Sequence, residues 1–244
     1  MSIWCWVGYD GKFRSPVIAG FGLNKNRIVW SIIGLQILIL SACTQQPSYG
    51  IDIYFVPATR FTRIESNYRA GNEGFFWVTW NEVGWIQHAN ILLSTEITQG
   101  FRDHLLREEL TQSLGLMNDS ARFSDSIFYS GESYGTFYLP IDRQVVTMLY
   151  QEAIQPNLTR DEVKKVLGSK FNQIEMTYFQ EVALVSEYGE NAVRARKWQA
   201  DIPIRVHGNP TEMDLIELER IINEVNHLLG GIELMAEIPD ALGH

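Results

Sequence analysis

One helix near the middle of the chain constrains the fold more than any other stretch of the sequence. Leucines stand at every fourth position, the spacing of a helix face that packs on a core: Leu106, Leu110 and Leu114. Polar residues repeat in the same way on nearly the opposite face: His104, Glu108 and Gln112. Gly115 follows at once, so the pattern predicts a helix over residues 103–114 that ends at Gly115, with Leu116 making the apolar contact of a Schellman-type cap.

Strands are predicted on both sides of this helix from runs of apolar and alternating residues. They cover residues 51–56, 75–80, 84–94, 197–206 and 232–238, and the third bends near His88. Further helices are expected over residues 140–150, from the capping box Thr159-x-x-Glu162 to Gly168, and from Thr211 to Gly230-Gly231. With 244 residues, of which 45% are hydrophobic, the chain can bury a sizeable core. We therefore expect an α/β (α+β) fold, a mixed twisted sheet with packed helices.

The N-terminal region has the organisation of a bacterial export signal. The run from Ile28 to Leu40 contains no charge, follows Lys25 and Arg27, and is shorter than the roughly 20 residues of a membrane-spanning helix. The tetrad Leu40-Ser41-Ala42-Cys43 resembles the lipobox of bacterial lipoproteins, which implies lipid attachment at Cys43. We expect a signal peptide over residues 1–42, with an upstream extension that can reflect a misplaced start, and a lipid-anchored linker over residues 43–50.

This reading carries expectations about location and partners. Thr44 stands where an aspartate would favour inner-membrane retention in Gram-negative lipoproteins, so the resemblance implies an outer-membrane anchor facing the periplasm. Only Cys43 would remain after cleavage, which leaves no disulfide and no cysteine-ligated metal. The net charge is −9 although the first 42 residues are basic, and an acidic body argues against binding nucleic acid.

The central helix resembles the active-site helix of metzincin zinc proteases, matrixins especially, whose pattern is His-Glu-x-x-His-x-x-Gly-x-x-His. With its glycine on Gly115, the ligand positions fall on Glu108, Gln112 and Asn118 and the general base on Glu109. Ser126-Ile127-Phe128-Tyr129 resembles the methionine-containing turn of matrixins, with Phe128 in the methionine's place. Leu139-Pro140-Ile141-Asp142 through Tyr150 resembles their closing helix. The resemblance implies a metzincin-like zincin fold with a degenerate active-site motif.

The same helix and the following Asn118-Asp119 also resemble a bacterial domain-of-unknown-function family, DUF2927. We expect a metzincin-like core over residues 51–168 and a strand, helix, strand unit over residues 169–244 that completes the same domain. In metzincin-like domains such a unit precedes the other strands, so the segment order here looks circularly permuted. A permutation of this kind requires residues 202–206 and 232–238 to lie in the same sheet as residues 51–56.

The side chains at the three expected ligand positions predict weak zinc binding. Zinc hydrolysis needs three good ligands and an open position for water, whereas Gln112 and Asn118 are weak neutral donors. Two alternatives stay open: His104 and Glu108 sharing a metal, against an ordinary surface pair, and an oxygen site for calcium made by Glu108, Asn118 and Asp119. Asp119 can instead brace the turn after Gly115.

We interpret Glu108, Glu109, Gln112, Asn118 and Asp119 as a pseudo-active site that binds a polar ligand or satisfies itself by internal hydrogen bonds. The expected function is that of a lipid-anchored envelope protein, a pseudo-metalloprotease that binds an unknown protein or peptide, without a cofactor. One alternative is a metal-dependent hydrolase or peptidase with Glu109 as catalytic base. The other is a purely structural envelope lipoprotein.

Two other sets of residues are candidates for a functional surface. Aromatic residues gather in the second and third expected strands, where core packing is favoured over a ligand groove: Phe75, Phe76, Trp77, Trp80 and Trp85. Three histidines stand alone in the sequence and are interpreted as structural or exposed: His88, His207 and His227.

Overall fold

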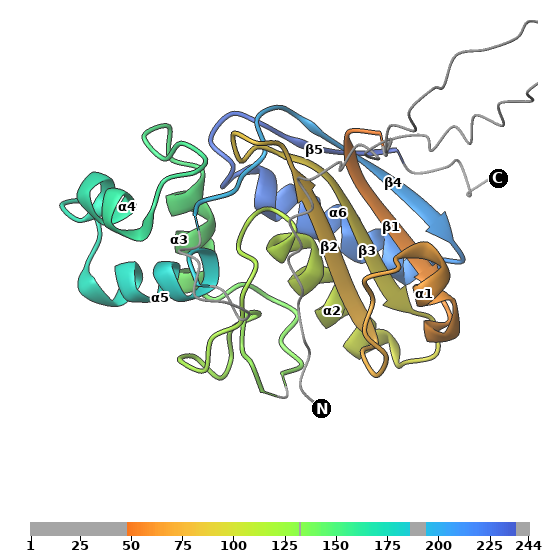
Figure 1. Cartoon of the computed structure of the whole chain (residues 1–244). Helices are drawn as coiled ribbons and strands as arrows, with labels where there is room; N and C mark the ends of the chain where they lie inside the picture. The colour runs from red at the N-terminus through yellow and green to blue at the C-terminus, as the bar shows by residue number, and fades with distance from the viewer. Residues whose placement is uncertain (1–47, 132, 186–193, 238–244) are drawn as a thin grey trace, which may run out of the picture. The chain divides into compact units, whose positions relative to one another are not determined.

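The computed structural model describes residues 48–131, 133–185 and 194–237 (Figure 1). The expected signal peptide and Cys43 lie outside these residues, as does most of the linker. All described residues belong to one compact unit. Among them, no helix has the length and apolar character that crossing a membrane requires.

A mixed sheet of five strands forms the centre of this unit, so the expected α/β class is confirmed. The strands are β1 (Gly50–Val56), β2 (Gly74–Trp80), β3 (Ile86–Ser94), β4 (Ile202–Gly208) and β5 (Leu234–Glu237). Their order is β2-β3-β1-β4-β5. β2 runs antiparallel to β3, and the other neighbours are parallel. The antiparallel strand therefore lies at one edge of the sheet.

The C-terminal strands join the same sheet as β1, as predicted. Ile204 of β4 pairs with Ile51 of β1 and, on its other side, with Ala236 of β5. The prediction is thereby confirmed for residues 202–206 and 234–237; Ile232 and Glu233 lie outside β5, and Ile238 lies outside the described residues. Parallel neighbours need a crossover connection, which the helix between β4 and β5 supplies.

The two faces of the sheet are covered differently (Figure 1). Helices α2 (Gln99–Gln112) and α6 (Glu212–Asn226) pack on one face and bury the main core, which includes Ile53, Phe76 and Leu110. The other face carries a smaller apolar cluster with Phe75, Trp77 and Phe61. Phe61 belongs to α1 (Phe61–Ile64), which follows the short 3₁₀ turn η1 (Ala58–Arg60). Successive side chains of β2 point to opposite faces of the sheet, so this strand contributes to both clusters.

Three helices form a group beyond the end of α2: α3 (Pro140–Leu149), α4 (Arg160–Leu167) and α5 (Gln173–Ala183). α3 lies at the predicted place, and α4 has the predicted capping box at Thr159 and ends at Gly168. α5 was not predicted. Its signal was present, since Asn172 caps the helix and Glu175 completes a second capping box.

Several boundaries differ from those predicted. α2 begins at Gln99, and α6 ends at Asn226 rather than at Gly230-Gly231. β4 begins at Ile202 rather than at residue 197, because Lys197 makes only an isolated bridge with Trp85. β3 begins at Ile86. His88 pairs with Thr79 and Ile86 pairs with Trp80, so Gln87 has no paired residue in β2, and this bulge is the irregularity expected near His88.

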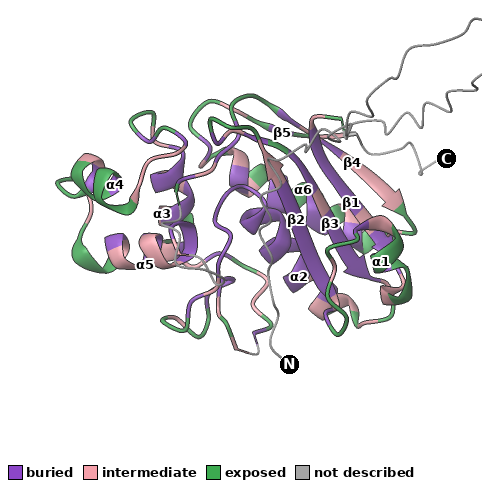
Figure 2. Cartoon of the chain, in the orientation of Figure 1, coloured by how far each residue is buried: buried purple, intermediate pink, exposed green. Residues whose placement is uncertain are grey.

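α2 is buried on every side, and this corrects the expectation of a helix with one apolar face and one polar face (Figure 2). His104, Glu108 and Gln112 are as buried as the leucines opposite them. The reason is tertiary: the sheet covers one side and α6 another, and residues after Gly115 bond to the rest, with Gly135 at His104, Tyr138 at Thr111 and Asp119 at Gln112. A helix with polar residues on a buried side needs partners for them from other elements.

Gly115 is required by a close approach as well as by its backbone conformation. Its φ is +115°, and a Cβ there would stand 2.1 Å from the carbonyl oxygen of Arg196. The helix itself ends at Gln112, followed by a tight turn in which the Gly115 N–H donates to the Gln112 carbonyl. Gly115 thus lets the segment before β4 cross the end of α2.

We predict that Gly115→Ala destabilises the protein more than Gly71→Ala. Both glycines have a positive φ, which costs about 1–3 kcal/mol for other residues, but nothing lies within 4 Å of a Cβ at Gly71. The clash with Arg196 adds about 1–3 kcal/mol to the free energy lost by Gly115→Ala. Denaturant unfolding of both variants measures the difference, and equal losses would contradict a close approach at Gly115.

Candidate functional site

Glu108 and Glu109 form the centre of the candidate site. Both side chains are completely enclosed, and none of their four carboxylate oxygens has a hydrogen-bond partner. Buried polar groups in folded proteins nearly always have such a partner, because burial without one costs free energy. Two adjacent exceptions on one helix therefore need an explanation.

His104 faces Glu108 from one turn earlier. Its Nδ1 lies 2.7 Å from the carbonyl oxygen of Gly135, which can only accept, so Nδ1 carries a hydrogen. Burial lowers the pKa of His104, although this bond acts to raise it, and the neutral ring presents an acceptor at Nε2. That atom lies 3.4 Å from Glu108 Oε2 in a fully buried pair, so the expected surface His–Glu pair is wrong.

Gln112 connects this face of the helix to Asp119. Its side-chain amide donates to the Asp119 carboxylate at 2.7 Å, which is the bracing role expected for Asp119. Burial raises the pKa of both Glu108 and Glu109 well above the ordinary value, and the charge of Asp119 raises both further. Glu108 and Glu109 therefore hold their protons to higher pH than exposed glutamates do.

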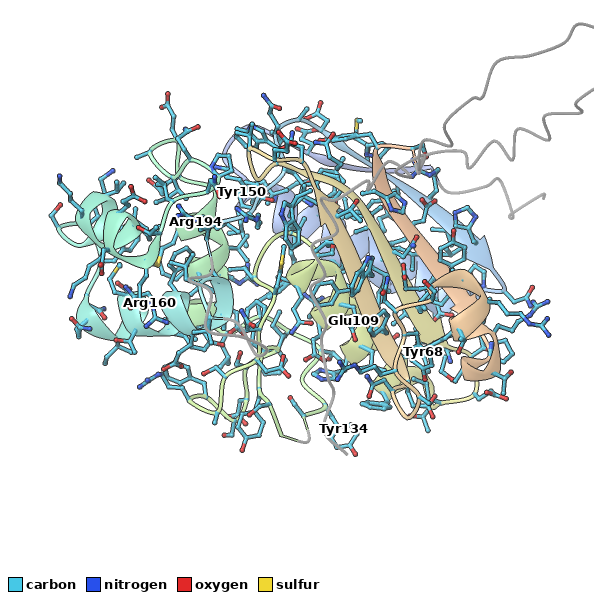
Figure 3. The ribbon with its side chains drawn as sticks, in the orientation of Figure 1. Tyr68, Glu109, Tyr134, Tyr150, Arg160 and Arg194 are labelled. Carbon is cyan, nitrogen blue, oxygen red and sulfur yellow. The ribbon has the colours of Figure 1, made fainter. Side chains whose placement is uncertain are left out.

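Glu109 lies against the edge strand of the sheet. A Cβ at Gly74 of β2 would come within 2.8 Å of Glu109 Oε1 and within 3.1 Å of Leu105. Figure 3 labels Glu109 beside this part of the sheet. The absence of a side chain at Gly74 thus leaves room for a carboxyl group between α2 and β2.

Asn118, which the sequence assigns to the pseudo-active site, makes its side-chain hydrogen bonds away from the other members of the group. Its side-chain amide donates to the carbonyl of Val185 at 2.6 Å and to that of Val182 at 3.4 Å. Its backbone N–H also donates to Val182. Asn118 therefore ties the loop after α2 to the end of α5. No hydrogen bond joins it to Glu108 or Gln112 among the described residues.

The cationic residues of α2 point toward α6 rather than toward the two glutamates. Arg102 donates to Asp214 at 2.7 Å. Arg107, also fully buried, donates to Glu217 at 2.9 Å and to Glu224 at 3.3 Å. α2 thus has two arginines that pair with carboxylates of α6 and, on a second side, two carboxyl groups whose oxygens have no hydrogen-bond partner.

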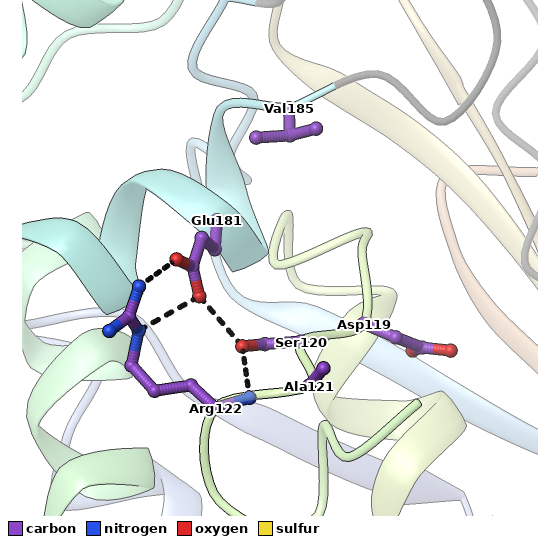
Figure 4. Close-up of a pocket in the computed structure, with 6 residues that line it drawn as sticks. All are labelled: Asp119, Ser120, Ala121, Arg122, Glu181 and Val185. Atoms are coloured by element: carbon purple, nitrogen blue, oxygen red, sulfur yellow. Dashed lines mark hydrogen bonds and ion pairs between the residues drawn. The ribbon is translucent and has the colours of Figure 1, made fainter. Parts of the chain in front are cut away.

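An open hollow of about 590 Å³ borders the group at Asp119. Its described lining is Asp119, Ser120, Ala121, Arg122, Glu181 and Val185 (Figure 4). Glu181 accepts hydrogen bonds from Ser120 and Arg122 on one side of the hollow, and Asp119 lies across Ser120 from them. Asp119 is therefore the member of the group that faces this hollow.

The side chains at the three positions assigned to zinc ligands do not fit the metal. Asn118 is engaged with backbone carbonyls, and Gln112 is bonded to Asp119. Within the described ranges, no three or more His, Cys, Asp or Glu side chains are arranged to hold a metal ion. The calcium alternative needs six to eight oxygens and relied on Asn118, so its proposed ligand set does not assemble either.

A second titratable network lies on the other face of the sheet, and sequence reasoning missed it. Asp52 of β1 is 2.8 Å from His88 of β3 and 2.6 Å from His207 of β4, and it also accepts two hydrogen bonds from Arg205. His88 and His207 therefore do not stand alone. Burial acts to raise the pKa of Asp52, but these donors hold that pKa well below its ordinary value.

The aromatic residues of β2 serve packing, as favoured from the sequence. Phe76 lies in the main core, and Phe75 and Trp77 lie in the cluster on the opposite face. Trp80 is partly buried, with the Arg196 guanidinium 5.0 Å from its ring centre. The third isolated histidine, His227, bonds to the Asn223 carbonyl at 2.6 Å, one turn earlier in the sequence.

Comparison with known proteins identifies a family. The family model described as "Protein of unknown function (DUF2927)" matches residues 38–169. The match covers more than half of the chain and includes β1, β2, β3 and helices α2 to α4. Searches of the curated proteins and of the solved structures found no match.

We predict that Glu108 and Glu109 make the stability of the protein fall as pH rises above about 5. Their pKa values are raised in the folded state, so folding binds protons and is favoured below the unfolded pKa of about 4.3. This advantage is lost as pH rises toward the folded pKa, by up to about 1.4 kcal/mol per pH unit for each proton.

Glu108→Gln and Glu109→Gln should each flatten this dependence, because glutamine keeps the shape of the side chain without its charge. Urea unfolding between about pH 5 and pH 9 measures the free energy at each pH. Glu219→Gln, an exposed change on α6, is the matched control and should follow the wild type. Parallel curves for all four proteins would show that the two buried carboxyls do not titrate in this range.

Proposed function

The chain belongs to the DUF2927 family of proteins of unknown function, and we propose that it is a lipid-anchored binding protein of the bacterial cell envelope. In this proposal it is a pseudo-metalloprotease that holds a ligand at the polar side of α2 and does not use zinc to hydrolyse peptides. The observation that carries the proposal is the pair of buried carboxyls Glu108 and Glu109, whose oxygens have no hydrogen-bond partner, near Asp119, which lines an open hollow.

A metzincin-like fold with permuted segments is part of the proposal. The unit β4–α6–β5, which precedes the other strands in that fold, follows them here and pairs with β1. A change in segment order can leave such pairing intact, since strand neighbours are set by burial and register rather than by position in the chain. The sheet order supports this reading.

The protonation of Glu109 argues against catalysis. A general base must be ionised to take a proton from water, but burial and Asp119 raise the pKa of Glu109 well above its ordinary value. A metal would have to make the water more acidic, and the side chains of Gln112 and Asn118 are engaged elsewhere. Binding therefore accounts for the arrangement better than hydrolysis does.

The sequence carries the proposal of a lipid anchor. The family match begins at residue 38, so the tetrad Leu40-Ser41-Ala42-Cys43 lies inside the matched region and shortly before β1. An anchor at Cys43 would hold the unit close to a membrane through the short segment that follows. We propose the outer membrane, on its periplasmic side.

We predict that Cys43→Ser abolishes lipid attachment. In a Gram-negative host, the wild-type chain should be recovered with the membranes and incorporate labelled fatty acid, because one cysteine carries the anchor. The variant should do neither. Cys5→Ser, the matched control, should behave as the wild type does. Labelling of the Cys43→Ser variant, or release by both substitutions, would contradict the anchor.

We predict that the purified protein holds less than stoichiometric zinc and cleaves no peptide in a mixed-sequence peptidase screen. Elemental analysis and mass spectrometry of the peptide pool measure the two properties. Glu109→Gln should change neither. Stoichiometric zinc together with a cleavage that Glu109→Gln abolishes would identify a peptidase and overturn the proposed function.

A further inference from the structure

The two buried glutamates and the aspartate beside them point to a class of ligand. We propose that Glu108 and Glu109, the carboxylate cluster near Asp119, bind a protonated primary amine, with the remainder of the ligand in the hollow that Asp119 lines. The inference rests on the proposed binding function and adds the chemistry of the ligand. The amine can belong to a lysine side chain of a peptide or to a free small molecule.

The unpartnered oxygens of Glu108 and Glu109 suit a cationic ligand. Glu108 and Glu109 offer four oxygens without hydrogen-bond partners, and both side chains are at most 1% exposed. Arg102 and Arg107, on the same helix, are paired with carboxylates of α6. His104 is held with its Nδ1 hydrogen on Gly135, so it presents a lone pair rather than a positive charge. A ligand that brings its own positive charge complements this arrangement.

The geometry favours an ammonium group over a metal ion. Metal ligands must converge to about 2.0–2.6 Å from one point, and no described set of three such side chains does so. An ammonium group donates three hydrogen bonds to oxygens at about 2.7–2.9 Å, so its partners can be more widely spaced than metal ligands. It is also a compact charge on a slender stem, which suits a partly enclosed site.

Access to the cluster is from the side of Asp119. The Glu108 side of α2 continues one turn later in Gln112, whose amide lies 2.7 Å from the Asp119 carboxylate. Asp119 in turn lines the hollow of about 590 Å³. Ala121 and Val185 line the same hollow and offer apolar contacts to an aliphatic stem. Neither glutamate is among the described lining residues of the hollow, so an amine has to pass Asp119 to reach their unpartnered oxygens.

Binding of the amine is coupled to release of protons. With no ligand, Glu108 and Glu109 retain their protons because of burial and of the charge on Asp119. An ammonium group stabilises the ionised form, so the carboxyl protons pass to solvent as it binds. No covalent bond is made or broken. Affinity should therefore increase as pH rises from about 5 to 8, while the amine remains protonated.

Isothermal titration of the full chain in detergent micelles tests the proposal with three probes: Nα-acetyl-lysine N-methylamide, its norleucine counterpart, which lacks the amine, and n-butylamine. The lysine derivative should bind with one site, and the norleucine compound at least about tenfold more weakly. The binding heat of the lysine derivative should vary with the ionisation enthalpy of the buffer, because protons are released when it binds. Binding of butylamine as tight as that of the lysine derivative would indicate a free small amine, and preference for the lysine derivative would indicate a lysine side chain.

Glu108→Gln and Glu109→Gln should each weaken lysine-derivative binding at least about tenfold and reduce the proton release. Asp119→Asn, at a half-buried position whose amide oxygen can still accept from Gln112, provides a second variant if the buried changes impair folding. Glu219→Gln should leave binding unchanged. Equal binding of the norleucine compound, or no binding of either amine, overturns the inference but leaves the proposed function standing, whereas zinc-dependent cleavage overturns the proposed function.

Discussion

The burial of α2 on every side is the constraint on which the rest of the structure depends. Ten of its residues are buried, and seven of these ten are polar or charged, so other elements must supply partners for them. α6 supplies Asp214 and Glu217 to the two arginines, at separations of more than 100 residues along the chain. Charges on α2, as well as apolar packing, thus fix the position of α6 on the sheet. They thereby fix the crossover between β4 and β5, which α6 forms.

The end of α2 is held by a different set of contacts, from the helices that follow it. Asn118 bonds to the end of α5, and Tyr150 after α3 donates to the Leu114 carbonyl at 2.9 Å. Buried Asp142 of α3 accepts from Ser126 and from Tyr178 of α5, which fixes the turn that contains Phe128. The loop that carries Asp119 is therefore supported at several points. This support holds Asp119 at the lining of the hollow, where it accepts a hydrogen bond from Gln112 of α2.

The sequence predicted those features that repeat locally. The leucine spacing located α2, alternation located the strands, and the capping box at Thr159 located α4. It could not predict that the polar side of α2 is buried, because the covering groups come from the loop after the helix, where Gly135 accepts from His104 and Asp119 accepts from Gln112. The network around Asp52 was missed for the same reason, since His88 and His207 meet only when three strands align. Asn118 was placed in the site by a motif, whereas its side chain is held by the end of α5.

The remaining polar groups of α2 explain why a site that cannot hold zinc need not be inert. Histidine nitrogens gather around a metal at about 2 Å, whereas Gln112 and Asp119 are joined by a hydrogen bond and the Glu108 oxygens have no hydrogen-bond partner. Such a group has two ways to relieve the cost of buried carboxylates: it keeps their protons, or it takes a cation from outside. Without a ligand, the carboxyl groups stay neutral because they keep their protons. When a cationic ligand binds, the protons are released to solvent. The feature that makes Glu109 a poor base, its raised pKa, therefore also makes it responsive to a cationic ligand.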